Sequence, residues 1–303
     1  MPDLAEAATS GAMAAVDPAL PPAPAAPKGA HIVDVLIAER APRLTGSAIW
    51  PLARPALYAL LGYGRARAMA DAIADRSGAD TLAWVTDLLQ LDVRTLNPGR
   101  LPATGRCLVI ANHPTGIADG LAVHAAVQQV RKDAIYFANA DALRVSPRLA
   151  ESVIPVEWVE SKRTREKTRA TLAAAREAFE QDRCVVMFPA GRLARVGPDG
   201  ALTDPPWATT AASLARRHGA PVVPIHVAGP SSTLFHLFDR VSQELRDVTL
   251  FHEMLNKTGR RFELRVGPPI PPDRLDVDPG KATEALKAYV ERVLPGQPDA
   301  PFA

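Results

Sequence analysis

The sequence contains few cysteines and no long apolar run. Cysteine occurs only at Cys107 and Cys184, each at the start of an apolar stretch, where a thiol usually serves as a small buried side chain. Two cysteines are too few for a disulfide framework or a cysteine metal site, and they indicate a reducing compartment. No stretch of about 18 apolar residues occurs, so a membrane-spanning helix is not predicted.

The chain also carries little net charge. Its 35 basic and 33 acidic residues leave a net charge of +2, without the basic footprint of a nucleic-acid-binding protein. Residues 1–30 are rich in Ala and Pro and contain Asp3 and Glu6 but no basic n-region. They predict a disordered tail rather than a secretory signal. We therefore expect a cytoplasmic protein with peripheral contact at the inner face of the membrane.

Several common catalytic signatures are missing. The chain has no G-x-G-x-x-G motif and no P-loop, which argues against a nucleotide-binding α/β protein. It has no G-x-S-x-G elbow, so no serine nucleophile is indicated. Its seven histidines show no metal-ligand spacing. We therefore expect neither a metal ion nor a bound cofactor.

Strand and helix signals alternate along most of the chain. Continuous apolar runs predict buried strands, and amphipathic segments between them predict helices, of which 161–181 is the clearest. The runs lie at 107–110, 134–138, 184–188 and 221–227. This pattern predicts an α/β fold with a largely parallel central sheet and helices on both faces. Residues 153–156 and 261–266 are predicted as edge strands, because the first is short and the second alternates strictly.

The domain boundaries follow from composition. Residues 31–95 predict an N-terminal helical segment, 96–295 the α/β domain, and 296–303 a short tail. Around Trp50 and Arg54, apolar and aromatic residues alternate with arginines, as in helices that lie in a bilayer interface. A helical pair packed on the core explains the same pattern.

The stretch CLVIANHPTGIADG (107–120) predicts a buried strand, a Pro/Gly turn and the start of a helix. His113 follows the strand, and Asp119 opens the helix. In open α/β folds ligands bind at the carboxyl ends of the strands. An imidazole suits proton transfer near neutral pH, and a carboxylate on its other nitrogen would orient it. His113 and Asp119 are therefore the candidate catalytic pair, provided that the turn brings them together.

A second segment, FPAGR (188–192), follows another buried strand at the same expected edge. Gly191 offers a backbone N–H group, and Arg192 and Arg195 offer guanidinium groups, all suited to an anion such as a phosphate. A solvated loop is the alternative. The candidate substrate-binding residues are Asn112, Phe188, Pro189, Gly191, Arg192 and Arg195.

The ordered blocks ANHPTGIADG, FPAGR and APVVPIHVAGP resemble the glycerolipid (lysophosphatidic acid type) acyltransferase superfamily over about 101–271. The resemblance makes 96–295 an acyltransferase domain with a membrane-contacting helical pair before it. It implies acyl transfer from acyl-CoA or acyl carrier protein to a lysolipid or glycerolipid hydroxyl. The family's His and Asp carry onto His113 and Asp119, and its F-P-x-G block onto Phe188, Pro189 and Gly191.

Two departures from the family pattern bear on the acceptor and the base. Five residues instead of four separate His113 from Asp119, and Gly116 is the residue able to absorb the extra one. Ala190 replaces the glutamate of F-P-E-G, which argues against a glycerol phosphate acceptor. F-P-A-G resembles the branch of hemolysin-like proteins and ornithine-lipid O-acyltransferases. The candidates for the family's middle basic block are Arg144, Lys162 and Arg163.

These residues suggest a mechanism as a hypothesis. His113 takes the proton of the acceptor hydroxyl, Asp119 orients His113, and backbone donors near Gly191 with Arg192 stabilise negative charge. Two other functions remain open. One is a lipid-binding accessory protein that has lost turnover, and the other is a hydrolase that uses the same base on water.

Overall fold

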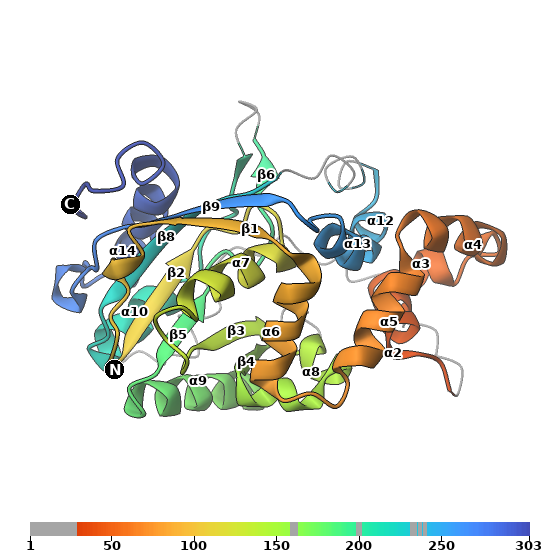
Figure 1. Cartoon of the computed structure of the whole chain (residues 1–303), viewed down its shortest axis with the longest axis horizontal. Coiled ribbons are helices and arrows are strands. Elements are labelled where there is room, and N and C mark those ends of the chain that lie inside the picture. Colours follow the sequence, from red (N-terminus) through yellow and green to blue (C-terminus); the bar gives the residue numbers. More distant parts are fainter. Residues whose placement is uncertain (1–28, 158–162, 198–201, 231–234, 236–237, 239–240) are drawn as a thin grey trace.

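The computed structural model describes residues 29–157, 163–197, 202–230, 235, 238 and 241–303 (Figure 1). Its centre is a seven-stranded sheet with the strand order β1-β9-β8-β2-β5-β3-β4. The strands are β1 (Asp92–Leu96), β2 (Cys107–Ala111), β3 (Ile135–Asn139), β4 (Val153–Val156), β5 (Cys184–Met187), β8 (Val222–Ala228) and β9 (Arg261–Val266). A two-stranded hairpin, β6 (Arg195–Val196) and β7 (Leu202–Thr203), stands apart from it. Most of the predicted tail, residues 1–28, lies outside the described residues.

The sheet is largely parallel, as predicted. β8, β2, β5, β3 and β4 pair in parallel, β9 pairs antiparallel with β8, and β1 pairs parallel with β9. The short strand β4 is at the edge, also as predicted.

The prediction of an edge position for β9 is wrong. β9 lies between β1 and β8, and the edge strand is β1, which crosses the boundary that the sequence suggested at residues 95 and 96. Phe262 and Leu264 are fully buried, whereas Arg261 and Glu263 are exposed. Alternation reports one covered and one solvated face of a strand, and an interior antiparallel strand shows the same pattern.

Helices cover the sheet on both faces. Along β2, Leu108 and Ile110 pack in a core with α9 and α10, while Cys107 and Val109 pack in a second core with α7. Because successive side chains point to opposite faces, a strand buried on both sides reads as a continuous apolar run. The helices are α2 (Ile32–Arg40), α3 (Pro42–Thr45), α4 (Trp50–Leu60), α5 (Tyr63–Ile73), α6 (Gly78–Leu89), α7 (Ile117–Val127), α8 (Asp141–Val145), α9 (Arg165–Glu180), α10 (Thr210–His218), α12 (Gln243–Val248), α13 (Leu250–Leu255) and α14 (Pro279–Ala288). Short 3-10 turns lie at Pro98–Arg100, Pro147–Glu151 and Pro272–Arg274, and a π-helical turn at Tyr289–Val293 follows α14.

Capping residues set the helix ends. The Thr164 hydroxyl accepts from the Lys167 N–H at 3.1 Å, so α9 begins at Arg165, four residues later than the periodicity suggests. Gly219 ends α10 with φ +60°, in the left-handed conformation that glycine adopts most readily.

The N-terminal helices α2 to α5 form a separate projection to the right of the sheet in Figure 1. Val33, Ile37 and Ala70 form a small core there with Val248 of α12, so the projection is packed on the domain. Asp34 of α2 accepts hydrogen bonds from the hydroxyls of Tyr58 (2.9 Å) and Tyr63 (2.6 Å), which tie α4 and α5 to α2. No helix within the described ranges is long and apolar enough to cross a membrane.

Candidate functional site

The candidate base follows the carboxyl end of β2 in the middle of the sheet. Asn112 is buried, and its side chain donates to the Val227 carbonyl (2.9 Å) and accepts from the Val227 N–H (2.7 Å) on β8. The amide therefore continues the β2–β8 pairing by one position. The side chain thus anchors the strand end from which His113 leaves, and the expected contact of Asn112 with substrate stays a prediction.

His113 and Asp119 meet. His113 Nδ1 lies 3.0 Å from Asp119 Oδ2, across the five intervening residues. Gly116 makes the turn possible with φ +95° and ψ −141°, a conformation that a residue with a Cβ rarely adopts. The extra residue is absorbed at the glycine to which the sequence pointed.

The Asp119 carboxylate is completely enclosed and saturated with donors. Besides His113, it accepts from the Thr115 N–H (2.8 Å), the Thr115 hydroxyl (2.6 Å) and the Gly116 N–H (2.9 Å). Because a carboxylate only accepts, His113 Nδ1 carries the proton of this pair and Nε2 keeps its lone pair. Within the described part of the chain, Nε2 makes no hydrogen bond. The arrangement is that of an oriented imidazole with its basic nitrogen free.

The FPAGR segment forms a wall beside this histidine. The Phe188 ring lies 4.6 Å from the His113 ring, at an interplanar angle of 33°. The Pro189 carbonyl accepts from the Ala208 N–H at 2.9 Å and so ties the wall to the chain before α10. The Gly191 N–H donates to the Phe188 carbonyl (3.0 Å) within a tight turn, where Gly191 has φ +62°. The Gly191 N–H group is therefore used within this turn, and the expected oxyanion donors near Gly191 stay a prediction.

Arg192 is a half-buried cation in a positive environment. Burial lowers the pKa of its guanidinium, and the neighbouring charges of Arg195 and Arg246 lower it further. Arg163 acts in the same direction, while the Asp247 carboxylate opposes it. Among the described residues, Arg192 makes no hydrogen bond or ion pair. A desolvated guanidinium of this kind is suited to an anionic group.

The other basic candidates do not form one cluster with Arg192. Arg195 is exposed on β6, opposite Thr203 of the hairpin. Arg144 joins α8 to α2 through an ion pair with Glu39 (2.8 Å) and forms a second ion pair within α8 with Asp141 (3.1 Å). Lys162 lies outside the described residues.

Sequence reasoning missed Asp204, which lies under the His113 loop. Both of its carboxylate oxygens accept from the His113 backbone N–H, at 3.0 and 3.1 Å, and Oδ2 also accepts from Trp207 Nε1 at 2.9 Å. Burial raises the pKa of Asp204 to about 6, although the hydrogen bonds from Trp207 and His113 lower it. No spacing rule points to this residue, because it lies 91 positions after His113 in a Pro-rich loop.

No cluster of three or more His, Cys, Asp and Glu side chains able to hold a metal ion occurs in the described ranges. The residues form an imidazole oriented by a carboxylate, the Phe188 ring beside it and, at the same edge of the sheet, a guanidinium that makes no ion pair with the described residues.

Comparison with known proteins finds one family, two similar proteins and one similar solved structure. A family described as Acyltransferase matches residues 92–228, a range that includes His113, Asp119 and the FPAGR segment. The chain is 27% identical over 203 residues to the lyso-glycine lipid O-acyltransferase of Phocaeicola vulgatus, covering 65% of this chain and 71% of that protein. It is 25% identical over 227 residues to the protein of the same name from Bacteroides thetaiotaomicron, covering 72% and 81%. The solved 1-acyl-sn-glycerophosphate acyltransferase PlsC from Thermotoga maritima superposes with a TM-score of 0.45 at 15% identity, over 70% of this chain and 77% of that one.

Proposed function

The chain belongs to the glycerolipid acyltransferase superfamily as a lipid O-acyltransferase, and we propose that His113 is the general base of its reaction. The observation that carries this proposal is the His113–Asp119 hydrogen bond of 3.0 Å, which leaves Nε2 free at the carboxyl edge of the sheet. The substrates are then a fatty acyl thioester, from acyl-CoA or acyl carrier protein, and a lysolipid with a free hydroxyl.

The proposed reaction is direct transfer. His113 Nε2 takes the proton of the acceptor hydroxyl. The hydroxyl oxygen attacks the thioester carbonyl carbon at the same time, so that a C–O bond forms. The tetrahedral intermediate collapses, the C–S bond breaks, and the leaving sulfur receives the proton from the imidazolium. Asp119 stabilises the imidazolium in between, as the carboxylate of a catalytic triad does. No enzyme nucleophile is required.

Arg192 is proposed to bind an anionic group of a substrate. Its guanidinium follows Phe188 in the chain, is partly desolvated and makes no ion pair with the described residues, so a substrate anion could bind it directly. The proteins named lyso-glycine lipid O-acyltransferases suggest an acceptor of the lyso-glycine lipid class. Ala190 in place of glutamate supports the same direction, away from glycerol phosphate.

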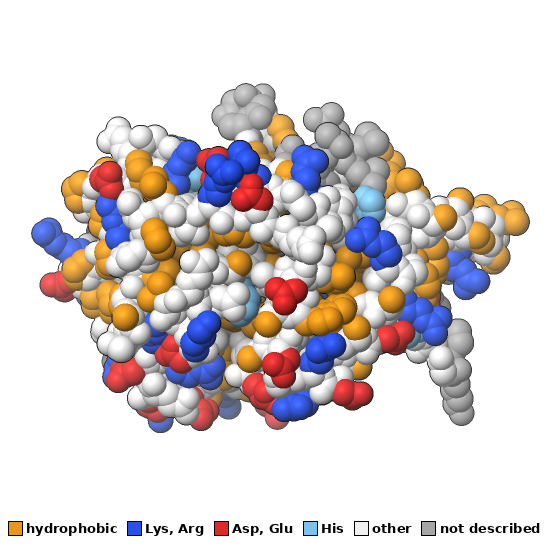
Figure 2. Space-filling view, in the orientation of Figure 1, with side chains coloured by type: hydrophobic (Ala, Val, Ile, Leu, Met, Phe, Trp, Pro, Cys, Tyr) orange, Lys and Arg blue, Asp and Glu red, His pale blue; other side chains and the backbone are white. Residues whose placement is uncertain are grey.

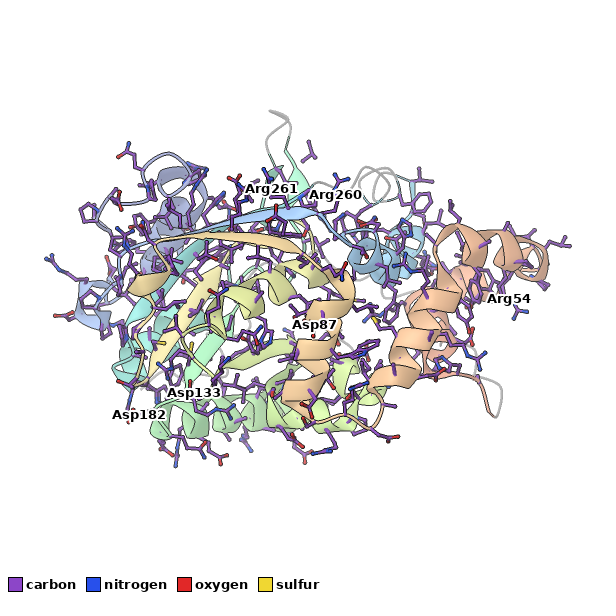
Figure 3. All side chains as sticks on the ribbon, in the orientation of Figure 1. Arg54, Asp87, Asp133, Asp182, Arg260 and Arg261 are labelled. Carbon is purple, nitrogen blue, oxygen red and sulfur yellow. The ribbon has the colours of Figure 1, made fainter. Side chains whose placement is uncertain are left out.

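We further propose that α4 binds peripherally to the inner face of the membrane, which contains the lipid substrates. None of its eleven residues is buried, and Leu52 is 85% and Leu60 59% exposed. Figure 2 shows apolar side chains gathered at this end of the molecule, and Figure 3 shows Arg54 there. A helix with exposed apolar and basic side chains suits a bilayer interface.

The test is an acyl-transfer assay with the full-length protein. Labelled acyl-CoA or acyl carrier protein is incubated with lyso-glycine lipid, lysophosphatidic acid or no acceptor. We expect an acylated lysolipid as product, and a decrease in kcat of about 10²–10⁴-fold in His113→Ala and Asp119→Asn.

The same assay separates the alternatives. Free fatty acid at an acceptor-independent rate would identify a hydrolase, and lipid binding without turnover in the wild type would identify an accessory protein. Turnover that survives His113→Ala would reject His113 as the base. Acylation of lysophosphatidic acid in preference to lyso-glycine lipid would reject the proposed acceptor class.

A further inference from the structure

We infer that Asp204 is a positioning residue for His113: it fixes the backbone of the loop that carries the base and so keeps the ring in line with Asp119. The inference rests on the proposed role of His113 as the base. It concerns a residue that lies far from His113 in the sequence and touches no candidate substrate position.

The two ends of the β6–β7 hairpin bind the backbone N–H and carbonyl groups of His113. Ala194, just before β6, donates its N–H to the His113 carbonyl at 2.9 Å. Asp204, just after β7, accepts the His113 N–H with both carboxylate oxygens. The peptide groups on both sides of the base are therefore immobilised by one structural unit, while Asp119 holds the ring. A catalytic group needs this precision, because a displacement of about 1 Å can reduce the rate about 10²-fold.

Asp204 is itself supported from the C-terminal part of the chain. Its N–H donates to Glu291 Oε1 at 2.7 Å, and Thr203 beside it donates its hydroxyl to Glu291 Oε2 at 2.9 Å. Lys287 of α14 forms an ion pair with Glu291 at 2.5 Å. The carboxylate beneath the base is thus connected to the closing helix by a continuous set of hydrogen bonds.

The charge of Asp204 is unfavourable for stability. Its pKa is raised to about 6 from 3.8, so the folded protein binds this proton more tightly than the unfolded chain. The contribution of Asp204 to the free energy of unfolding therefore falls as the pH rises from about 4 to about 6, and the cost is fully present at pH 8. A buried carboxylate retained at such a cost, with its oxygens on the His113 N–H, indicates a role in the site.

Protonation of Asp204 would weaken the hydrogen bonds that it accepts from His113 and Trp207. A protonated Asp204 would present an O–H donor to two groups that are themselves donors, the His113 N–H and Trp207 Nε1. The titratable groups that face Asp204 are His113 on the β2 loop and Glu291 after α14, with Lys287 behind Glu291. The acid limb of the wild-type pH profile should therefore contain the ionisation of Asp204.

The test measures kcat, KM and the thermal midpoint of the full-length protein between pH 5 and 9. It uses labelled acyl-CoA and lyso-glycine lipid in detergent, with acyl carrier protein as the second donor. For Asp204→Asn we expect kcat to fall by about 10–100-fold with KM nearly unchanged, and the acid limb to become shallower by one proton. The Tm of this variant at pH 8 should equal or exceed that of the wild type. Hydrogen exchange of the His113 amide should become faster.

Trp207→Phe is the second variant. It removes a hydrogen bond that lowers the pKa of Asp204, so the acid limb should move to higher pH while the carboxylate remains. Asp133→Asn is the matched control. Asp133 accepts from Arg131 at 2.7 and 2.6 Å, at the opposite edge of the sheet (Figure 3), so its loss should lower Tm and leave the pH profile unchanged.

The outcomes separate the two proposals. If His113→Ala is inactive but Asp204→Asn keeps the wild-type kcat, acid limb and amide exchange, Asp204 has no positioning role and the base assignment stands. If Asp204→Asn only lowers Tm, its role is structural and the inference is overturned. If His113→Ala remains active, the proposed base fails first.

Discussion

Gly116 is the residue that allows His113, the proposed base, and Asp119 to meet. With five residues between His113 and Asp119, the chain must fold back within one short turn, and Gly116 takes φ +95° to do so. The same turn aims the N–H groups of Thr115 and Gly116 at the Asp119 carboxylate. A Cβ at this position would also lie 3.1 Å from the Leu193 side chain. Geometry at one residue therefore decides whether Asp119 can orient the imidazole.

We expect Gly116→Ala to lower the free energy of unfolding by about 1–3 kcal/mol, the usual cost of a strained backbone conformation, and to lower kcat. Urea unfolding and the acyl-transfer assay measure the two effects. Gly120→Ala in the same helix is the control for stability, because its Cβ would meet no atom closer than 3.9 Å and alanine favours a helix. Equal stability of the two variants would show that Gly116 is not strained.

At the scale of elements, α4 differs from the other long helices in that none of its residues is buried. Trp50, which with Arg54 belongs to the segment expected to contact the membrane, packs edge-on against Tyr58 with ring centroids 5.9 Å apart. Its replacement would therefore change stability as well as membrane binding. Leu52 is the sharper probe, because its side chain is almost fully exposed and packs on little of the protein.

We expect Leu52→Asp to weaken binding to vesicles of anionic phospholipid about 10-fold or more, since burial of one leucine contributes about 1.5–3 kcal/mol. Its Tm should remain unchanged. Val277→Asp is the matched control, because Val277 is 79% exposed and lies outside the N-terminal helices. Vesicle flotation measures the binding; equal binding of Leu52→Asp and the wild type would contradict a membrane role for α4.

At the scale of the whole molecule, the two edges of the sheet have different tasks. The carboxyl edge carries His113, Phe188 and Arg192, whereas the amino edge is held by the buried Arg131. Its guanidinium donates to the carbonyls of Pro102, Gly105 and Asp182 and to the Asp133 carboxylate (donor–acceptor distances 2.6–3.0 Å). This one side chain joins the loops that enter β2, β3 and β5.

We expect Arg131→Met to lower the free energy of unfolding by about 3–5 kcal/mol, because Asp133 loses its partner and three carbonyls lose donors. Activity at low temperature should be retained, since the carboxyl edge is not touched. Urea unfolding with a parallel kcat measurement at 15 °C checks both. A large loss of kcat in folded Arg131→Met would contradict this separation of tasks.

The predictions from sequence succeeded for features that residues close together in the chain determine. His113 and Asp119 belong to a strand–turn–helix unit, and the unit places them at the sheet edge whatever surrounds it. Local order did not reveal the structural role of Asn112, whose side-chain amide hydrogen-bonds to Val227 on β8. It also misled at β9, because alternation records a solvated face and not a position in the sheet.

The sequence by itself determined the α/β class, the candidate base and its aspartate, since apolar runs, a Pro/Gly turn and helix periodicity act within a few residues. The tertiary structure alone decided the interior position of β9, the positive surroundings of Arg192 and the place of Asp204 beneath His113. These depend on contacts between segments many residues apart, such as the 91 positions between His113 and Asp204. Such contacts form only when the chain packs, because no local periodicity specifies which loops meet.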